Sequence, residues 1–161
     1  AATGFGAPAG LFPKEASLGI TSIMGRIEAI WIKRAHLGPM DPIWTAQAVP
    51  GKGLLGCASN SRTRQVTIIE KEVWESLMAE VGGDAPPSSR RANIMVSGLP
   101  LANSRNRLLR AGSVLMRIAG ETTPCTSMDE VIPGLRLAMS RNWGGGAFAQ
   151  VLREEIGRAH V

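Results

Sequence analysis

The sequence predicts a mainly β protein with minor α structure, folded as a closed or nearly closed β-barrel with short peripheral helices. Of the 161 residues, 44% are hydrophobic and no long block of like charge separates them, as expected for a folded chain. The 19 glycines and 10 prolines imply many turns, which suit short strands better than a helical bundle. Several short segments alternate in polarity or are rich in β-branched residues. Closing such strands into a barrel removes exposed sheet edges.

Residues 1–18 are predicted to form a flexible N-terminal arm, and residues 19–161 a single domain. The arm is rich in Ala and Gly but lacks a basic start followed by a continuous apolar core, so it does not read as a secretion signal. No stretch of the chain approaches the roughly 18 apolar residues needed to span a membrane. Two cysteines are too few for a disulfide scaffold. We therefore expect a cytoplasmic protein with no membrane partner.

The first strand is predicted over Ile23–Lys33, where polar and apolar side chains alternate toward the end of the segment. Residues 35–61 are punctuated by Gly and Pro and should form loops with at most short strands. A second, short strand is predicted at residues 64–69, which are rich in β-branched side chains.

The hydrophobic period then changes to that of a helix over residues 73–81, where apolar side chains recur every four residues. This helix should end at Gly82 and cover part of the core. Residues 84–89 form a linker rich in Pro and Ser. Two further strands are predicted at residues 91–96 and 114–118.

The last third of the chain mixes helical and extended segments. Residues 128–139 are helical in character but contain Pro133, so two short helical pieces are expected. Three glycines at residues 144–146 break the chain before a strand at residues 148–152. Residues 158–161 could pair with that strand through a turn.

Cys125 is the leading candidate for a reactive side chain. It stands between the predicted strand at residues 114–118 and the helical segment, directly after Pro124. Thr126 and Ser127 suit a helix start, so the thiol would lie near unpaired backbone N–H groups that stabilise a thiolate. The alternative is a small apolar side chain buried at a loop, as is common for free cysteines.

The charge of the protein indicates an anionic partner. The formal net charge is +5 and the calculated isoelectric point is near 10. Such a balance suits a phosphate-bearing cofactor, a nucleic acid or an acidic surface, and charge alone does not choose among them.

Four segments, in order along the chain, resemble the MOSC family, a domain found at the C-terminus of molybdenum cofactor sulfurases. They are Gly53-Leu54-Leu55-Gly56 and residues 64–70, 90–101 and 120–125. The resemblance extends from about Met24 to the end of the chain. It implies a mostly β barrel of the MOSC type, an association with the molybdenum cofactor (molybdopterin), and a role for Cys125 in carrying sulfur or ligating molybdenum.

The resemblance also implies a set of cofactor-binding residues. Arg91 and Asn93 match an Arg-x-Asn pattern of the family, and on a strand residues two apart point to the same face. They would offer a fork for the cofactor phosphate and an amide for the pterin edge. Arg90 would lie on the opposite side and is a weaker candidate, whereas Arg64 would add positive potential. Thr123 lies where its hydroxyl could hydrogen-bond the ligand.

Each of these cofactor-binding candidates has a purely structural interpretation. The arginines could be solvated charges on an edge strand, and Asn93 could be bonded only to neighbouring backbone. Thr123 could simply cap the turn before Pro124.

The sequence departs from the family pattern at Cys57, where members commonly carry an Asp. Cys57 is either a second thiol that acts as a resolving partner for Cys125, or a small buried replacement for the Asp. The second interpretation is favoured. His36 and His160 are far apart and show no ligand pattern, so a zinc site is not expected.

Two mechanisms use Cys125 differently. In the first, its thiolate ligates molybdenum in a cofactor-dependent enzyme that reduces N-hydroxylated substrates, with electrons from a separate reductase. In the second, Cys125 carries sulfane sulfur as a persulfide received from a partner such as a cysteine desulfurase. A basic barrel that binds nucleic acid without catalysis is a third hypothesis, and the absence of Tyr disfavours it because few aromatic rings remain for base stacking.

Overall fold

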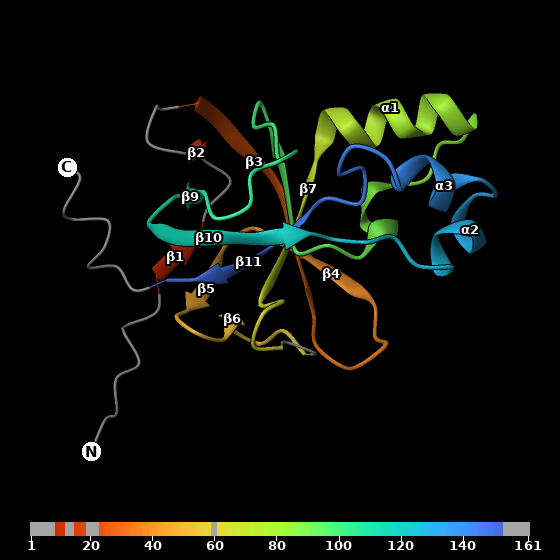
Figure 1. Ribbon diagram of the computed structural model, residues 1–161. Helices are drawn as coiled ribbons and strands as arrows, with labels where there is room; N and C mark the ends of the chain where they lie inside the picture. The colour runs from red at the N-terminus through yellow and green to blue at the C-terminus, as the bar shows by residue number, and fades with distance from the viewer. Residues whose placement is uncertain (1–8, 12–14, 19–22, 59–60, 153–161) are drawn as a thin grey trace, which may run out of the picture.

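The computed structural model describes residues 9–11, 15–18, 23–58 and 61–152. Seven strands form a closed barrel, because the two ends of the strand order pair with each other through β2 and β3 (Figure 1). Around the barrel the order is β2 (Glu15–Leu18), β9 (Leu108–Ala111), β10 (Val114–Glu121), β11 (Ala147–Val151), β7 (Val66–Glu70), β8 (Ile94–Ser97) and β3 (Ile23–Lys33). The β7–β8 pair is parallel, and the other pairs are antiparallel. The predicted closed β-barrel is confirmed.

The remaining strands are short and lie beside the barrel. β4 (Met40–Ile43) continues the sheet from the far end of β3, which is long enough to pair with three other strands. β1 (Ala9–Leu11), β5 (Ala46–Val49) and β6 (Gly53–Leu54) form a separate three-stranded sheet. The short strands expected within residues 35–61 are therefore present.

β2 corrects the predicted domain boundary. Its residues pair with both β3 and β9, so Glu15–Leu18 is part of the barrel wall and not of an arm outside the domain. Leu18 is 1% exposed and Ala16 is 2% exposed, and both pack in the main core. The hydrophobic effect thus explains why this segment joins the barrel despite its weak local pattern. Residues 1–8, 12–14 and 19–22 of the predicted arm and boundary, like residues 158–161, lie outside the described residues.

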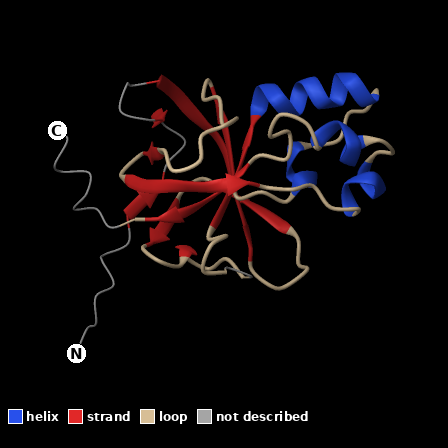
Figure 2. Cartoon of the chain, in the orientation of Figure 1, coloured by secondary structure: helices blue, strands red, loops and turns tan. Residues whose placement is uncertain are grey.

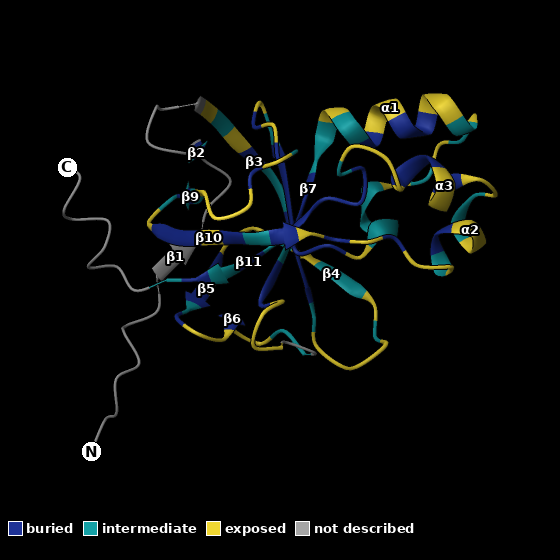
Figure 3. Ribbon diagram, in the orientation of Figure 1, coloured by how far each residue is buried: buried dark blue, intermediate teal, exposed yellow. Residues whose placement is uncertain are grey.

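The barrel interior is filled by alternate side chains of its strands. In β11, for example, Ala147, Ala149 and Val151 are buried, whereas Phe148 and Gln150 between them are only half-buried (Figure 3). This alternation is the period-two pattern expected of a sheet with one face in the core. The sheet therefore has an apolar inner face and a more polar outer face.

The helices gather on one side of the barrel (Figure 2). They are α1 (Lys71–Val81), the 3-10 turn η1 (Pro87–Arg90), α2 (Ser127–Val131) and α3 (Leu135–Met139). α1 ends at Gly82 in the left-handed conformation, as predicted, and the two short helices flank Pro133 as predicted. Trp74 and Leu77 of α1 pack with Met128 and Leu135 in a second apolar core. None of the described helices has the length and apolarity needed to cross a membrane.

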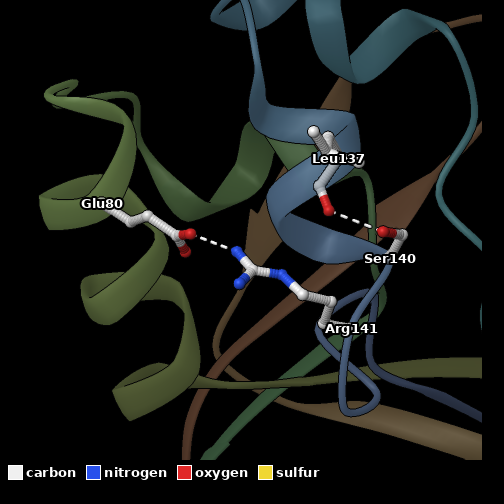
Figure 4. A network of polar contacts seen from close by, with 4 residues as sticks. All are labelled: Glu80, Leu137, Ser140 and Arg141. Carbon is white, nitrogen blue, oxygen red and sulfur yellow. Dashed lines mark hydrogen bonds and ion pairs between the residues drawn. The ribbon is translucent and has the colours of Figure 1, made fainter.

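Polar contacts hold the end of α3 against α1 (Figure 4). The guanidinium of Arg141 forms an ion pair with the carboxylate of Glu80 in α1. The Ser140 hydroxyl donates to the Leu137 carbonyl at 2.6 Å and closes the last turn of α3. α3 packs against both α1 and α2.

Candidate functional site

Cys125 lies in the loop that connects β10 to α2, and its side chain is exposed. Pro124 directly before it is buried, and Thr126 directly after it is the N-cap residue of α2. The helix start predicted at Thr126 and Ser127 is therefore found. The alternative of a cysteine sealed in the core is wrong, because the thiol is open to solvent.

The surroundings of Cys125 favour its thiolate form. Its Sγ lies 2.7 Å from the Ser127 Oγ, and with the thiolate present the hydroxyl is the donor. The Ser127 hydroxyl is the largest cause of a lowered pKa of the Cys125 thiol, followed by the Ser127 backbone N–H. Partial burial opposes the lowering, and the positive charge of Arg90 adds to it. The side chain is thus an exposed thiol poised to ionise.

Arg90, at the end of η1, is the cation that acts on this thiolate. Its Nε donates to the Gly145 carbonyl at 3.1 Å, which fixes a half-buried guanidinium beside the Cys125 loop. Burial lowers the pKa of Arg90, and the negative charge of the Cys125 thiolate opposes that shift. Within the described residues the buried Nη2 of Arg90 has no hydrogen-bond partner. The guanidinium therefore keeps an unused donor next to the site.

The three glycines before β11 make this arrangement sterically feasible. A Cβ on Gly145 would lie 2.1 Å from the carbonyl oxygen of Thr122, three residues before Cys125. The Thr122 N–H donates to the Gly146 carbonyl at 2.8 Å, so the two backbones run in direct contact. The buried Thr122 hydroxyl is, like the Arg90 Nη2, without a partner in the described part of the chain. Only glycine fits so close a backbone approach.

Arg64 extends the positive charge outward from Arg90. Its side chain is exposed, and its guanidinium carbon lies 5.2 Å from the centre of the Phe148 ring. Its charge contributes to the lowered pKa of Arg90. Thr123 is exposed in the same loop as Cys125. The charge of Arg64 therefore acts on Arg90, and the charge of Arg90 acts on Cys125.

The predicted placement of Arg91 on a strand is wrong. β8 begins only at Ile94, and Arg91 is the residue that ends η1, with a left-handed φ of 63°. Its exposed side chain donates to the Gly38 carbonyl in the loop between β3 and β4. A 3-10 turn followed by a left-handed residue does not alternate like a strand, so the reason for pairing Arg91 with Asn93 is lost. The same turn brings Arg90 to the Cys125 loop instead.

Asn93 is buried, with 7% of its surface exposed, and its side chain forms hydrogen bonds within the barrel wall. Its Oδ1 accepts from the Thr67 N–H at 3.1 Å and from the Thr67 hydroxyl at 3.2 Å. Its Nδ2 donates to the Trp31 carbonyl at 3.3 Å and to the Cys57 Sγ at 3.5 Å. Both ends of the amide are thus engaged, and the structural interpretation of Asn93 matches its contacts.

Cys57 belongs to this Asn93 cluster, where it packs half-buried against the main core. Besides accepting from Asn93, its Sγ donates to the Ala58 carbonyl at 3.5 Å. These contacts support the prediction of a small, partly buried replacement for the family Asp.

The described residues contain no group of three or more His, Cys, Asp or Glu side chains arranged to hold a metal ion. Cys125 is therefore a single soft donor, supported by a hydroxyl and by cations and not by further metal ligands. Sequence reasoning missed the Ser127 hydroxyl as the direct partner of the thiol. A Ser two residues after a Cys at a helix start is the local signal for it.

The comparisons agree with this fold. The model of the MOSC domain family matches residues 33–155. The crystal structure of the YUAD protein from Bacillus subtilis superimposes with a TM-score of 0.61 at 18% identity, covering 86% of this chain and 90% of that one. A crystal structure of a hypothetical protein gives a TM-score of 0.64 at 14% identity, with 88% of this chain covering 63% of that one. No curated protein matches the sequence significantly.

Proposed function

The chain belongs to the MOSC domain family, a family related to molybdenum cofactor sulfurases, and we propose that it carries sulfane sulfur as a persulfide on Cys125. The observation that carries this proposal is the exposed Cys125 thiol, whose pKa is lowered by Ser127 and Arg90. A sulfur carrier needs a thiolate that partners can reach, because the thiolate is the attacking species in sulfur exchange. The exposure of Cys125 and the lowered pKa of its thiol support both requirements.

The proposed loading step is a thiol–disulfide type exchange. The Cys125 thiolate attacks the outer sulfur of a donor persulfide, the S–S bond of the donor breaks, and the donor leaves as a thiolate. The outer sulfur is then bonded to Cys125, and no electrons are gained or lost overall. In the delivery step an acceptor thiolate attacks that sulfur in turn and releases the Cys125 thiolate. Ser127 and Arg90 stabilise the negative charge at Cys125 before loading and after delivery.

The family suggests a molybdenum cofactor, which this chain would have to hold with the residues around Cys125. The Cys125 thiolate is chemically suited to molybdenum, a metal that accepts soft sulfur ligands. Two of the residues expected to hold the pterin, Asn93 and Arg91, do not fit, because both ends of the Asn93 amide are engaged and Arg91 contacts Gly38. The Asp of the family pattern is replaced by Cys57, which is bonded to Asn93. The proposed sulfur transfer therefore does not use this cofactor.

Persulfide loading can be tested directly by mass spectrometry. The purified protein is incubated with glutathione persulfide, and the intact mass and the Cys125 peptide are measured. We expect the gain of one sulfur atom on Cys125 in the wild type and in Cys57→Ser, and no gain on that peptide in Cys125→Ser. Sulfur found on Cys57 but not on Cys125 would contradict the proposal.

Metal analysis separates this proposal from a role of Cys125 as a molybdenum ligand. Protein purified from a host that makes the cofactor is analysed for molybdenum, together with Cys125→Ser. We expect substoichiometric molybdenum that is unchanged by the substitution. Stoichiometric molybdenum that is lost in Cys125→Ser would overturn the carrier function in favour of a cofactor-dependent enzyme.

A further inference from the structure

An arginine-rich face lies on the outer side of the neighbouring barrel strands β9 and β10, next to β11. Its charged members lie on these strands or in the segments that precede β7 and β9. We call it the arginine face, and it consists of Arg62, Arg64, Arg105, Arg107, Arg110 and Arg117. Five of these arginines are exposed, and Arg110 is half-buried.

The strand register places the central arginines on one surface. Arg117 of β10 lies opposite Leu108 of β9 and Gln150 of β11, while the flanking Met116 and Ile118 point into the core. Arg110 of β9 lies opposite Leu115 in the same way. Because side chains of a strand alternate between faces, these arginines must all project outward.

Arg64 and Arg105 both lie beside Phe148, at the end of the arginine face that is nearer Cys125. Arg64 lies over the Phe148 ring, and the Arg105 Nη1 donates to the Ala119 carbonyl at 3.2 Å. A Cβ on Gly120 would lie 3.2 Å from both the Arg105 Nη2 and the Phe148 ring, so the two side chains border the same point. Arg64 also acts electrostatically on Arg90, which acts on Cys125. The arginine face is thus electrostatically continuous with the reactive thiol.

Among the described side chains, few carboxylates lie near this charge. Glu121, at the end of β10, is the single carboxylate within β9, β10 and β11. The ion pairs found within the described residues use Arg34 and Arg141, and neither belongs to the face. Most acidic side chains instead lie in or beside the helices on the other side of the site, namely Glu70, Glu72, Glu75, Glu80, Asp84, Asp129 and Glu130.

We propose that the arginine face docks an acidic surface of the protein that donates sulfur to Cys125, an inference that rests on the proposed function. Oppositely charged surfaces accelerate and orient encounter, which would bring the donor persulfide to the exposed thiol. Arginines interspersed with apolar side chains such as Leu108 are typical of protein interfaces. Phe148 is the only aromatic residue of strands β9, β10 and β11, and Arg64 already lies over its ring, which disfavours stacking of nucleic acid bases.

The test compares sulfur transfer from a large and a small donor. The donors are a purified cysteine desulfurase charged with persulfide and glutathione persulfide, and the variant is Arg105→Glu combined with Arg117→Glu. We expect transfer from the desulfurase to slow by roughly tenfold or more in this variant and also to slow with added salt in the wild type. Transfer from glutathione persulfide, a small anion, should slow far less than transfer from the desulfurase, because it needs no docking surface.

A matched control reverses the same number of charges elsewhere. Arg26 on β3 and Arg136 on α3 are exposed and lie outside the face, so Arg26→Glu combined with Arg136→Glu should transfer sulfur from both donors at the wild-type rate. If transfer from the desulfurase slows equally in the control and in the face variant, the slowing is caused by the change in net charge, and the docking site is contradicted. Unchanged transfer from the desulfurase in the face variant would overturn it as well.

Direct binding keeps this inference distinct from the carrier function. Association of fluorescently labelled desulfurase is measured by anisotropy with the wild type and with the face variant. Salt-sensitive binding to the wild type that is lost in the face variant would support the docking site, whether or not Cys125 takes up sulfur. If Cys125 takes up no sulfur from either donor, only the carrier function is contradicted. Undetectable binding by the wild type, or retention of a single-stranded oligonucleotide by the arginine face in place of the desulfurase, would overturn the docking of an acidic protein.

Discussion

At the scale of single residues, reactivity at Cys125 depends on its immediate neighbours more than on the barrel. The Ser127 hydroxyl and backbone N–H act on the sulfur directly, whereas Arg90 acts through its charge. The Ser127 hydroxyl lies at hydrogen-bond distance from the sulfur, whereas the charge effect of Arg90 at an exposed sulfur is weakened by solvent screening. The order of these contributions therefore follows from the exposure of the thiol.

Ser127→Ala should raise the pKa of Cys125 toward its ordinary value. The variant loses the 2.7 Å contact but keeps the backbone N–H at the start of α2. A higher pKa means less thiolate at any pH below it, so alkylation by iodoacetamide should slow and its midpoint should move to higher pH. The rates are measured across pH in a Cys57→Ser background.

Two further variants control this measurement. Arg90→Met should move the midpoint in the same direction but by less, because Arg90 contributes less than Ser127 to the lowered pKa. Ser140→Ala removes a hydroxyl that bonds only within the end of α3 and should leave the midpoint in place. An unshifted midpoint in Ser127→Ala would mean that the hydroxyl does not hold the thiolate.

At the scale of elements, the site is formed where a loop, a 3-10 turn and a glycine run meet. The β10–α2 loop carries the thiol, η1 supplies Arg90, and Gly145 lies between them. The bond from Arg90 to Gly145 spans 55 residues of sequence, so the site forms only when these segments pack. The glycines permit the close backbone approach that this packing requires.

Gly145→Ala should therefore disturb both stability and the thiol. The added Cβ would collide with the Thr122 carbonyl, and overpacking of this kind costs about 1–3 kcal/mol. Shifting Thr122 also shifts the loop of Cys125, so the alkylation rate should change. Thermal unfolding and alkylation kinetics measure the two effects.

Gly134→Ala is the control for this glycine. Gly134 has a left-handed φ of 89°, but a Cβ there would meet no atom within 4 Å. Its substitution should cost about 1–2 kcal/mol through backbone strain alone and leave the alkylation rate of Cys125 unchanged. An alkylation rate for Gly145→Ala that matches the wild type would show that the loop does not depend on the glycine contact.

At the scale of the whole molecule, barrel closure and charge asymmetry shape the protein. β2 is short, yet it supplies the pairing with both β3 and β9 that closes the sheet. The barrel carries exposed or half-buried arginines on the outer side of β9 and β10, whereas most carboxylates lie in or beside the helices. The arginine face is therefore a property of the closed barrel and not of any one strand.

Leu18→Ala should destabilise the protein strongly, because Leu18 is buried in the core and pairs with Leu109. Truncation of a buried Leu costs about 2–5 kcal/mol through lost burial and the cavity left behind. Ser17→Ala, at the outward neighbouring position in β2, should stay within about 0.5 kcal/mol of the wild type. Denaturant unfolding measures both, and similar values for the two would argue against β2 as a wall of the barrel.

How much of the fold the sequence predicts depends on the length of each element. β3 and α1 have enough residues to show their hydrophobic periods, and both were predicted closely. β2 and β9 have 4 residues each, too few for a period to stand out, and were missed. Their strand character comes from pairing with each other and with longer neighbours.

The sequence by itself determined the class of the fold, the family, and the thiol at a helix start, because each depends on local composition or on the order of motifs. Only the tertiary structure decided which residues accompany that thiol. Arg90, in the 3-10 turn that ends at the left-handed Arg91, lies beside the Cys125 loop, while Asn93 is bonded to Cys57 in the barrel wall. These outcomes rest on the burial of polar groups and on contacts between distant segments, which no local pattern encodes.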